Sequence, residues 1–141
     1  MAKEIKGYYD VGEEYEFYCD VKEILALAKT EVFVIDPYLS NEIFKLYANG
    51  ISRSVILRIL SERVPASTAA IAAKYASEGD LALCTTSLIH DRLILIDGRA
   101  WVIGQSIKDA AKKKPTDIVE QSTQHIRPAY EHIWADAAVL H

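Results

Sequence analysis

The stretch that decides the predicted fold covers residues 89–106 and reads IHDRLILIDGRAWVIGQS. Within it, the apolar run 93–96 has the length of a β-strand, and Asp97-Gly98 is a strong signal for a tight hairpin turn. Residues 101–103 then return as the partner strand. Four apolar residues in a row indicate a strand covered on both faces, as in the middle of an α/β sheet. The sequence therefore predicts a β-hairpin near the centre of a sheet.

Three ionisable residues, His90, Asp91 and Arg92, lie directly before this apolar strand. Because residues i and i+2 of a strand share a face, His90 and Arg92 should point the same way. A lone histidine in this position is more often a partly buried structural residue. A neutral imidazole beside a guanidinium, however, suits a site that attacks or holds a phosphate.

The spacing of these residues resembles the HKD motif of the phospholipase D superfamily. In that motif His-x-Lys is followed after four residues by Asp, and after six more by Gly-Ser-x-Asn. Here His90 and Arg92 are followed by Asp97 and Gly104 at the same spacing. Arg92 stands where the family has Lys, and Gly104 is followed by Gln-Ser-Ile instead of Ser-x-Asn. With the order of helices and strands added, the resemblance covers roughly residues 30–125.

The resemblance implies a metal-independent, nuclease-like phosphodiesterase that acts through a phosphohistidine and needs no cofactor. His90 would be the nucleophile, Arg92 would bind the non-bridging oxygens, and Asp97 would complete the motif. Glu120, with Asp117 behind it, would orient the histidine. Further phosphate contacts would come from Gln105, Ser106 and Lys108. Because the family's chemistry uses two motif histidines and this chain has one motif, the site would form in a homodimer, with two His90 residues facing each other.

The departures from the motif leave a second interpretation open. It is a catalytically impaired phospholipase D-like domain that binds nucleic acid or another phosphate ligand, or that recruits a partner. Arginine can clamp phosphate bidentately, but it is bulkier and more planar than lysine. Judged from its residue type alone, Asp97 is a turn residue. A lysine-rich stretch that follows is by default a solvated loop, although it could contact a nucleic-acid backbone. Its members are Lys108, Lys112, Lys113 and Lys114.

Composition places the chain among globular proteins. Its 141 residues predict one domain covering residues 1–141, with 50% hydrophobic and 26% charged residues. A net charge of −4 argues against a whole-protein footprint for nucleic acid, but not against a local patch. The apolar runs are too short for a membrane span, and the first residues lack the apolar core of a signal peptide. Cys19 and Cys84 make no metal spacing, so we expect free thiols and a cytoplasmic location.

The remaining segments complete the expected fold. Periodicity predicts an N-terminal helix at about 13–29, a sheet core at about 31–122 and a C-terminal helix at about 128–140, with Pro128 at its first position. Strands and helices alternate up to Leu83, which implies parallel strands with right-handed crossovers. The predicted fold is α/β, with a mixed, mostly parallel sheet of about six strands and helices on both faces. Loops after parallel strands usually hold ligands, and Asp36-Pro37-Tyr38 follows one such strand.

Overall fold

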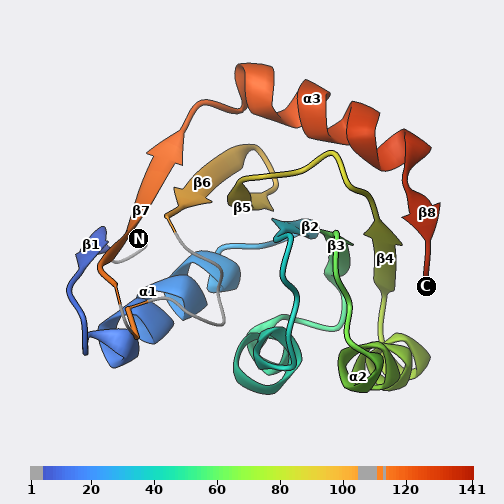
Figure 1. Cartoon of the computed structure of the whole chain (residues 1–141), viewed down its shortest axis with the longest axis horizontal. Coiled ribbons are helices and arrows are strands. Elements are labelled where there is room, and N and C mark those ends of the chain that lie inside the picture. Colours follow the sequence, from blue (N-terminus) through green and yellow to red (C-terminus); the bar gives the residue numbers. More distant parts are fainter. Residues whose placement is uncertain (1–4, 105–110, 113) are drawn as a thin grey trace.

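The computed structural model describes residues 5–104, 111–112 and 114–141. In this part of the chain an eight-stranded sheet has the order β1-β7-β6-β5-β2-β3-β4-β8 (Figure 1). Its strands are β1 (Tyr8–Tyr9), β2 (Glu31–Ile35), β3 (Ile56–Ser61), β4 (Leu81–Thr85), β5 (Arg92–Ile96), β6 (Arg99–Ile103), β7 (Thr116–Gln121) and β8 (Ala138–Val139). The helical segments are α1 (Glu14–Ala26), a π-helical turn η1 (Ile43–Tyr47), a 3-10 turn η2 (Ala48–Gly50), α2 (Ala66–Glu78) and α3 (Thr123–Asp136).

The expected α/β class and the mixed sheet are confirmed, but two details of the prediction are wrong. The sheet has eight strands instead of about six, because two-residue strands β1 and β8 extend its two edges. It is also not mostly parallel, since only the pairs β2–β3 and β3–β4 are parallel and the other neighbouring pairs are antiparallel. Helical crossovers link only β2, β3 and β4. The chain then forms the β5–β6 hairpin, continues into β7 and ends in β8, which pairs with β4 at the opposite edge of the sheet.

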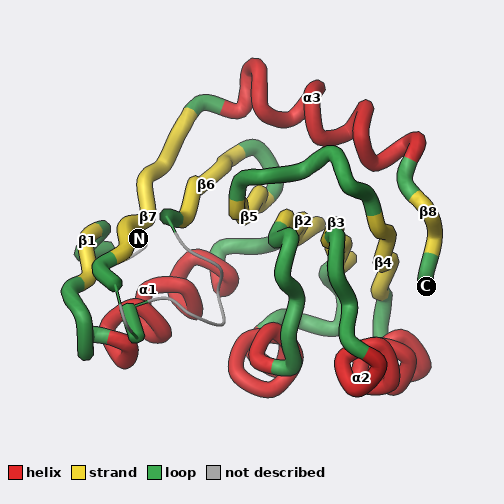
Figure 2. The backbone as a smooth tube through the Cα atoms, viewed as in Figure 1, coloured by secondary structure: helices red, strands yellow, loops and turns green. Residues whose placement is uncertain are grey.

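Helices cover both faces of the sheet, as the sequence predicts. Figure 1 and Figure 2 show α1, η1 and α2 on one side of the strands and α3 lying across the other side. The strand side chains alternate between these two layers, as the period of a β-strand requires. The α1–α2 layer buries Val32, Val34, Leu57, Ile59, Leu83, Ile94 and Ile96. The α3 layer buries Phe33, Ile35, Leu60, Leu93, Leu95 and Ala100, packed against Ile126, Tyr130, Ile133 and Trp134.

Strand β5 has the central, doubly covered position that its apolar run predicts. It lies between β6 and β2, and each of its residues from Leu93 to Ile96 is at most 2% exposed. The hairpin also forms as expected, because Ile96 pairs with Arg99 across the two-residue turn Asp97-Gly98. Asp97 has a positive φ of 52°, which aspartate tolerates better than most residues.

The C-terminal helix differs from its prediction. Helix α3 begins at Thr123 and ends at Asp136, so the predicted start at Pro128 is wrong. The Ser122 side chain caps the helix by accepting a hydrogen bond of 3.2 Å from the Gln124 N–H. Pro128 lies inside the helix, where it removes one backbone hydrogen bond. Its exposed ring leaves the apolar face of α3 free to pack on the sheet, which holds the helix together across the proline.

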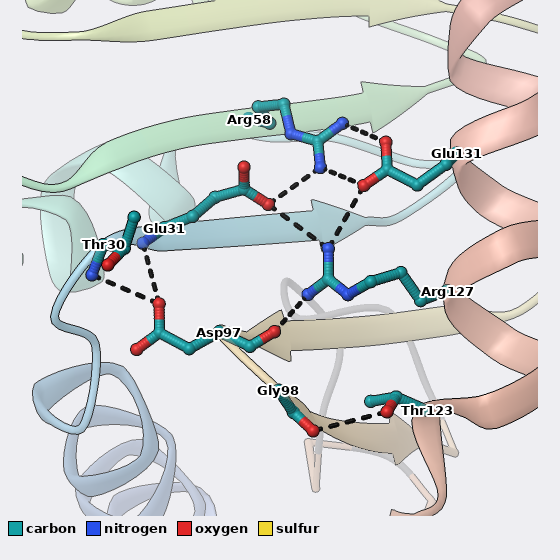
Figure 3. Close-up of polar contacts among 8 residues, drawn as sticks. All are labelled: Thr30, Glu31, Arg58, Asp97, Gly98, Thr123, Arg127 and Glu131. Atoms are coloured by element: carbon teal, nitrogen blue, oxygen red, sulfur yellow. Dashed lines mark hydrogen bonds and ion pairs between the residues drawn. The ribbon is translucent and has the colours of Figure 1, made fainter.

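A charged cluster links α3 to the sheet (Figure 3). The Arg58 guanidinium on β3 donates to Glu131 of α3 at 2.7 Å and to Glu31 of β2 at 2.8 Å. It also lies 4.0 Å from the centre of the Phe33 ring and 5.1 Å from that of Trp134. The hydrogen bond from Arg58 is the main cause that holds the pKa of Glu131 below its usual range. The cluster therefore orients α3 on its sheet face, in addition to the apolar contacts. No helix of the described residues is long and apolar enough to cross a membrane.

Candidate active site

The direction of the strands brings the candidate residues to one edge of the sheet. The parallel strands β2, β3 and β4 all end there, and the antiparallel strand β5 begins there, because Ile35 pairs with Leu93. The loop that starts with Asp36 and the segment that contains His90 therefore lie beside each other. Sequence alone gave no strand directions from which to place His90 relative to this loop.

These loops enclose a pocket of about 470 Å³. It takes residues from the segments after β2, after β3 and before β5. They are Pro37, Tyr38, Glu62, Ser87, Leu88, Ile89, His90 and Arg92. The volume lies within the range of small-ligand sites, which is about 300–1,000 Å³. His90 and Arg92, the pair that the sequence singles out, thus line one pocket, and the His90 side chain is exposed in it.

Arg92 supplies the positive charge of this pocket. It is the first residue of β5, and its guanidinium carbon lies 5.8 Å from the centre of the Tyr38 ring. Its Nε is buried and has no hydrogen-bond partner among the described residues. The Nε of Arg58, which lies outside the pocket, is buried and unpartnered in the same way, so the lining of the pocket by Arg92, and not its Nε, points to a ligand. A planar guanidinium at this position suits a phosphate or carboxylate.

The loop that carries Tyr38 is held firmly by hydrogen bonds. Buried Asp36 accepts a 3.0 Å hydrogen bond from the Tyr38 N–H through its Oδ1. The Pro37 carbonyl accepts from the Arg63 N–H at 3.0 Å and from the Ser61 hydroxyl at 3.3 Å. These bonds tie the segment after β2 to the end of β3 and the segment after it, and they fix the backbone of Tyr38.

One acidic residue, Glu62, also lines the pocket and is exposed. Its carboxylate opposes the binding of an anion beside Arg92, so the described lining of the pocket combines one fixed cation, one acid and one histidine. Among the residues that the structure describes, no group of three or more His, Cys, Asp or Glu side chains is placed to hold a metal ion.

Asp97, which the motif resemblance puts in the catalytic set, lies at the other end of β5. Its carboxylate accepts backbone hydrogen bonds from Lys29 at 3.0 Å, Thr30 at 3.2 Å and Glu31 at 3.0 Å, part of which Figure 3 shows. These bonds, first the one from Lys29, hold the pKa of Asp97 below its usual range. The structure does not bring Asp97 to His90. It places Asp97 where the side chain fixes the start of β2.

Glu120 is also remote from His90. It lies opposite Trp101, which lies opposite Ile94, two residues beyond Arg92 along β5, whereas His90 precedes the strand. The Glu120 carboxylate instead accepts two hydrogen bonds from Arg99, at 2.7 and 2.9 Å. This contact is the main reason that the pKa of Glu120 is lowered. Orientation of His90 by Glu120 therefore has no geometric support within one chain.

Asp117, the second carboxylate of that prediction, begins β7 at the end of the sheet where β5 starts. Its carbonyl accepts a 3.0 Å hydrogen bond from the Gly104 N–H. A Cβ atom at Gly104 would lie 2.7 Å from the Asp117 Oδ1 and 3.1 Å from the Thr116 hydroxyl oxygen, so a larger residue would require the exposed Asp117 carboxylate to rotate away and Thr116 to shift. This close contact gives the motif's glycine a steric reason. Gln105, Ser106, Lys108 and Lys113 lie outside the described residues, and Lys112 and Lys114 are exposed.

Sequence reasoning placed Tyr38 in a ligand-binding loop without giving it a role, and it did not single out Glu62 or the segment 87–89. Tyr38 and Glu62 directly follow parallel strands, and the rule that ligands bind at carboxyl ends of such strands favours both positions. It was applied to the segment 36–38 without singling out a side chain. Leu88, which is 71% exposed, has no sequence signal of its own.

Comparison with known proteins adds fold relationships. No protein-family model and no curated protein matches the chain. Among solved structures, NucT from Helicobacter pylori superposes with a TM-score of 0.67 at 11% identity, covering 94% of this chain and 96% of that one. Phosphatidylserine synthase from Haemophilus influenzae gives a TM-score of 0.64 at 12% identity, covering 96% of this chain and 38% of that one.

A third similar structure is TrmBL2, an archaeal chromatin protein described as showing a novel mode of DNA binding. It gives a TM-score of 0.60 at 14% identity, covering 95% of this chain. The chain spans 50% of the length of TrmBL2. Identities this low demonstrate a shared fold. The chain therefore shares its fold with NucT, with the synthase and with TrmBL2.

Proposed function

We propose that the chain is a nuclease-like phosphodiesterase whose substrate phosphate binds in the pocket at the edge of the sheet. The observation that carries this proposal is the placement of His90 and Arg92, an imidazole and a guanidinium, in one pocket. The fold shared with NucT, a nuclease of the phospholipase D superfamily, supports a phosphodiester substrate.

In the proposed reaction, Arg92 donates hydrogen bonds to the non-bridging oxygens and holds the phosphate against His90. The His90 nitrogen forms a bond to phosphorus while the bond to the leaving oxygen breaks. A second imidazolium protonates that oxygen. Water then attacks the phosphohistidine, which releases the phosphate product and restores the neutral imidazole of His90.

The second imidazole would come from another copy of the chain, because the pocket is lined by a single histidine. A two-fold axis places identical residues opposite each other, so His90 of the partner subunit would lie across the same phosphate. Leu88 is two residues from His90 and 71% exposed. It would provide apolar contact area beside the axis.

A second candidate function is binding of nucleic acid without cleavage. Two observations favour it: Arg92 replaces the motif lysine, and Glu62 places a negative charge in the pocket. The fold shared with the DNA-binding protein TrmBL2 fits the same function. In this case Arg92 would hold a backbone phosphate, and exposed Lys112 and Lys114 would contact phosphates farther along the strand.

Hydrolysis in EDTA separates the two candidates. Wild type, His90→Ala and Arg92→Ala are incubated with bis(p-nitrophenyl) phosphate and with single- and double-stranded DNA. His132→Ala, which changes an exposed histidine of α3, serves as the matched control. The enzyme predicts cleavage by wild type and the control, and none by His90→Ala. The binding protein predicts no cleavage by any variant and salt-sensitive DNA binding that Arg92→Ala weakens.

The dimer is tested separately by sedimentation at the assay concentration. The proposed two-histidine site requires activity to rise with the dimer fraction. Full activity in a monomer would contradict it. Leu88→Glu places a charge in the proposed contact, so it should lower both the dimer fraction and the activity, and an unchanged dimer fraction would place the interface elsewhere.

A further inference from the structure

Tyr38 presents an aromatic surface to the pocket that phosphate chemistry alone does not require. Its side chain is 42% exposed although the residue lines the pocket. The Arg92 guanidinium carbon lies 5.8 Å from the ring centre. The Tyr38 ring and the Arg92 cation therefore lie side by side. A nucleotide has a matching pair of groups, because its base could stack on the ring while its phosphate binds the cation.

The backbone that carries the ring is fixed before any ligand arrives. The backbone of Tyr38 is bound to the Oδ1 of buried Asp36, and the preceding carbonyl accepts hydrogen bonds from the segment after β3. Tyr38 also forms an isolated parallel bridge with Arg63. A ring on a fixed backbone loses little conformational entropy when a second ring stacks on it.

We propose that Tyr38 is a stacking platform for one base of a single-stranded nucleic acid, and that Arg92 and His90 contact the adjoining phosphate. This inference rests on the proposed phosphate site and adds the substrate class. In a duplex, each base already stacks on its neighbours and is paired, so it cannot lie flat on Tyr38. A lipid headgroup or free phosphate would use Arg92 but would offer no ring for Tyr38.

The test compares two labelled oligomers of equal length by fluorescence anisotropy in EDTA. One is oligothymidylate and the other has the same sugar-phosphate backbone with abasic tetrahydrofuran units. All proteins carry His90→Ala so that the oligomers stay intact. Tyr38→Ala should weaken oligothymidylate binding by about fivefold or more, because stacking on an aromatic side chain contributes that much per base. It should leave the abasic oligomer and a duplex unchanged, and Tyr38→Phe should retain most of the affinity.

The two oligomers distinguish stacking from an indirect effect through Arg92. If Tyr38→Ala weakens both oligomers equally, or neither, Tyr38 is not a base platform, and the proposal is overturned. Arg92→Gln tests the underlying phosphate site, because it should weaken both oligomers alike. A selective effect of Tyr38 with no effect of Arg92 would support the platform and refute the phosphate site. If the His90→Ala protein binds both oligomers equally while wild type, which retains His90, hydrolyses the chromogenic diester, the platform is refuted and the phosphate site is supported.

Discussion

Replacing Asp97 by Asn tests whether this residue holds the fold together or takes part in chemistry. Oδ2 of Asp97 accepts the Lys29 N–H, and Oδ1 accepts the N–H groups of Thr30 and Glu31. Asparagine has nearly the same shape and tolerates the positive φ of 52° at this position. The substitution therefore removes the charge and turns one acceptor into an NH₂ group, while the backbone stays as it is.

The expected loss follows from these three hydrogen bonds. A hydrogen bond to a buried charged group contributes about 1.5–3 kcal/mol, and a neutral one about 1 kcal/mol. Asp97 is partly exposed, so solvent reduces the charged contribution, and the Asn carbonyl still accepts from two of the N–H groups. We expect Asp97→Asn to lower the free energy of unfolding by about 1–2 kcal/mol. Asp97→Ala should lose about 1 kcal/mol more, because alanine is strained at a positive φ.

Urea denaturation measures this loss, with Asp136→Asn at an exposed position of α3 as the control. The backbone N–H groups lower the pKa of Asp97 in the folded state, so its contribution is present above the ordinary aspartate pKa of about 3.9 and is lost as the pH falls through the folded value. The difference between wild type and Asp97→Asn should therefore shrink below about pH 4. Unchanged stability together with loss of diester hydrolysis would refute the structural role and return Asp97 to the catalytic set.

Three further substitutions test the pocket, the glycine contact and the α3 cluster. Glu62→Gln should tighten binding of a phosphodiester by about 2- to 10-fold at low salt, as measured by anisotropy, because it removes a repulsive charge; equal affinity would place Glu62 away from the phosphate. Gly104→Ala should cost about 1 kcal/mol or less of stability in urea, because the exposed carboxylate can rotate away, and a second change, Asp117→Ser, should recover part of this loss if the clash with the carboxylate is the cause. Glu131→Gln should cost about 1–3 kcal/mol by leaving Arg58 with a weaker acceptor. Because the pKa of Glu131 is lowered in the folded state, that difference should vanish toward acidic pH, and a difference that persists there would point to packing.

The central elements of the fold were predictable because their signals are local. The run 93–96 has no polar residue, and Asp97-Gly98 forms the turn that its residue types favour. The edges were not predictable in the same way. Strands β1 and β8 have two residues each, too few for any periodicity, and both form by pairing with strands far away in the sequence. The antiparallel majority of the sheet depends on these pairings and on β7.

Helix α3 shows how tertiary packing overrides a local preference. Proline favours the first position of a helix, and residues 117–122 have a strand-like composition, so the helix seemed to begin at Pro128. Thr123 to Arg127 nevertheless belong to the helix, because Ser122 caps it and Ile126 packs on the sheet. That packing depends on contacts with strands that are distant in the sequence, so a prediction from neighbouring residues cannot include it.

In the candidate site, too, the residues predicted from the sequence are those with local signals, and the others are brought in by the fold. His90 and Arg92 were found because they are neighbours in the sequence, whereas Tyr38 and Glu62 join them only through the parallel register of β2 and β3. The sequence analysis put Glu120 first and Asp117 second as the carboxylate that orients His90, but Asp117 lies at the His90 end of the sheet and Glu120 lies farther from it. Strand β6 runs from the hairpin turn toward the His90 end, so β7 begins at that end and leaves it. The first carboxylate of β7, not the later one, therefore lies at the level of the pocket.

The number of imidazoles in the pocket is what separates the two candidate functions. One histidine and one arginine suffice to bind a phosphate, because the guanidinium neutralises charge and the imidazole donates a hydrogen bond. Cleavage through a phosphohistidine needs in addition an acid for the leaving oxygen, and His90 cannot attack phosphorus and protonate that oxygen in the same step. Among the pocket residues that the structure describes, Glu62 and Tyr38 also carry ionisable groups, but a carboxylate repels the substrate and a phenol is a much weaker acid than an imidazolium. The proposed mechanism therefore takes its acid from His90 of the partner subunit, and whether two copies face each other across His90 separates the proposed enzyme from the binding protein.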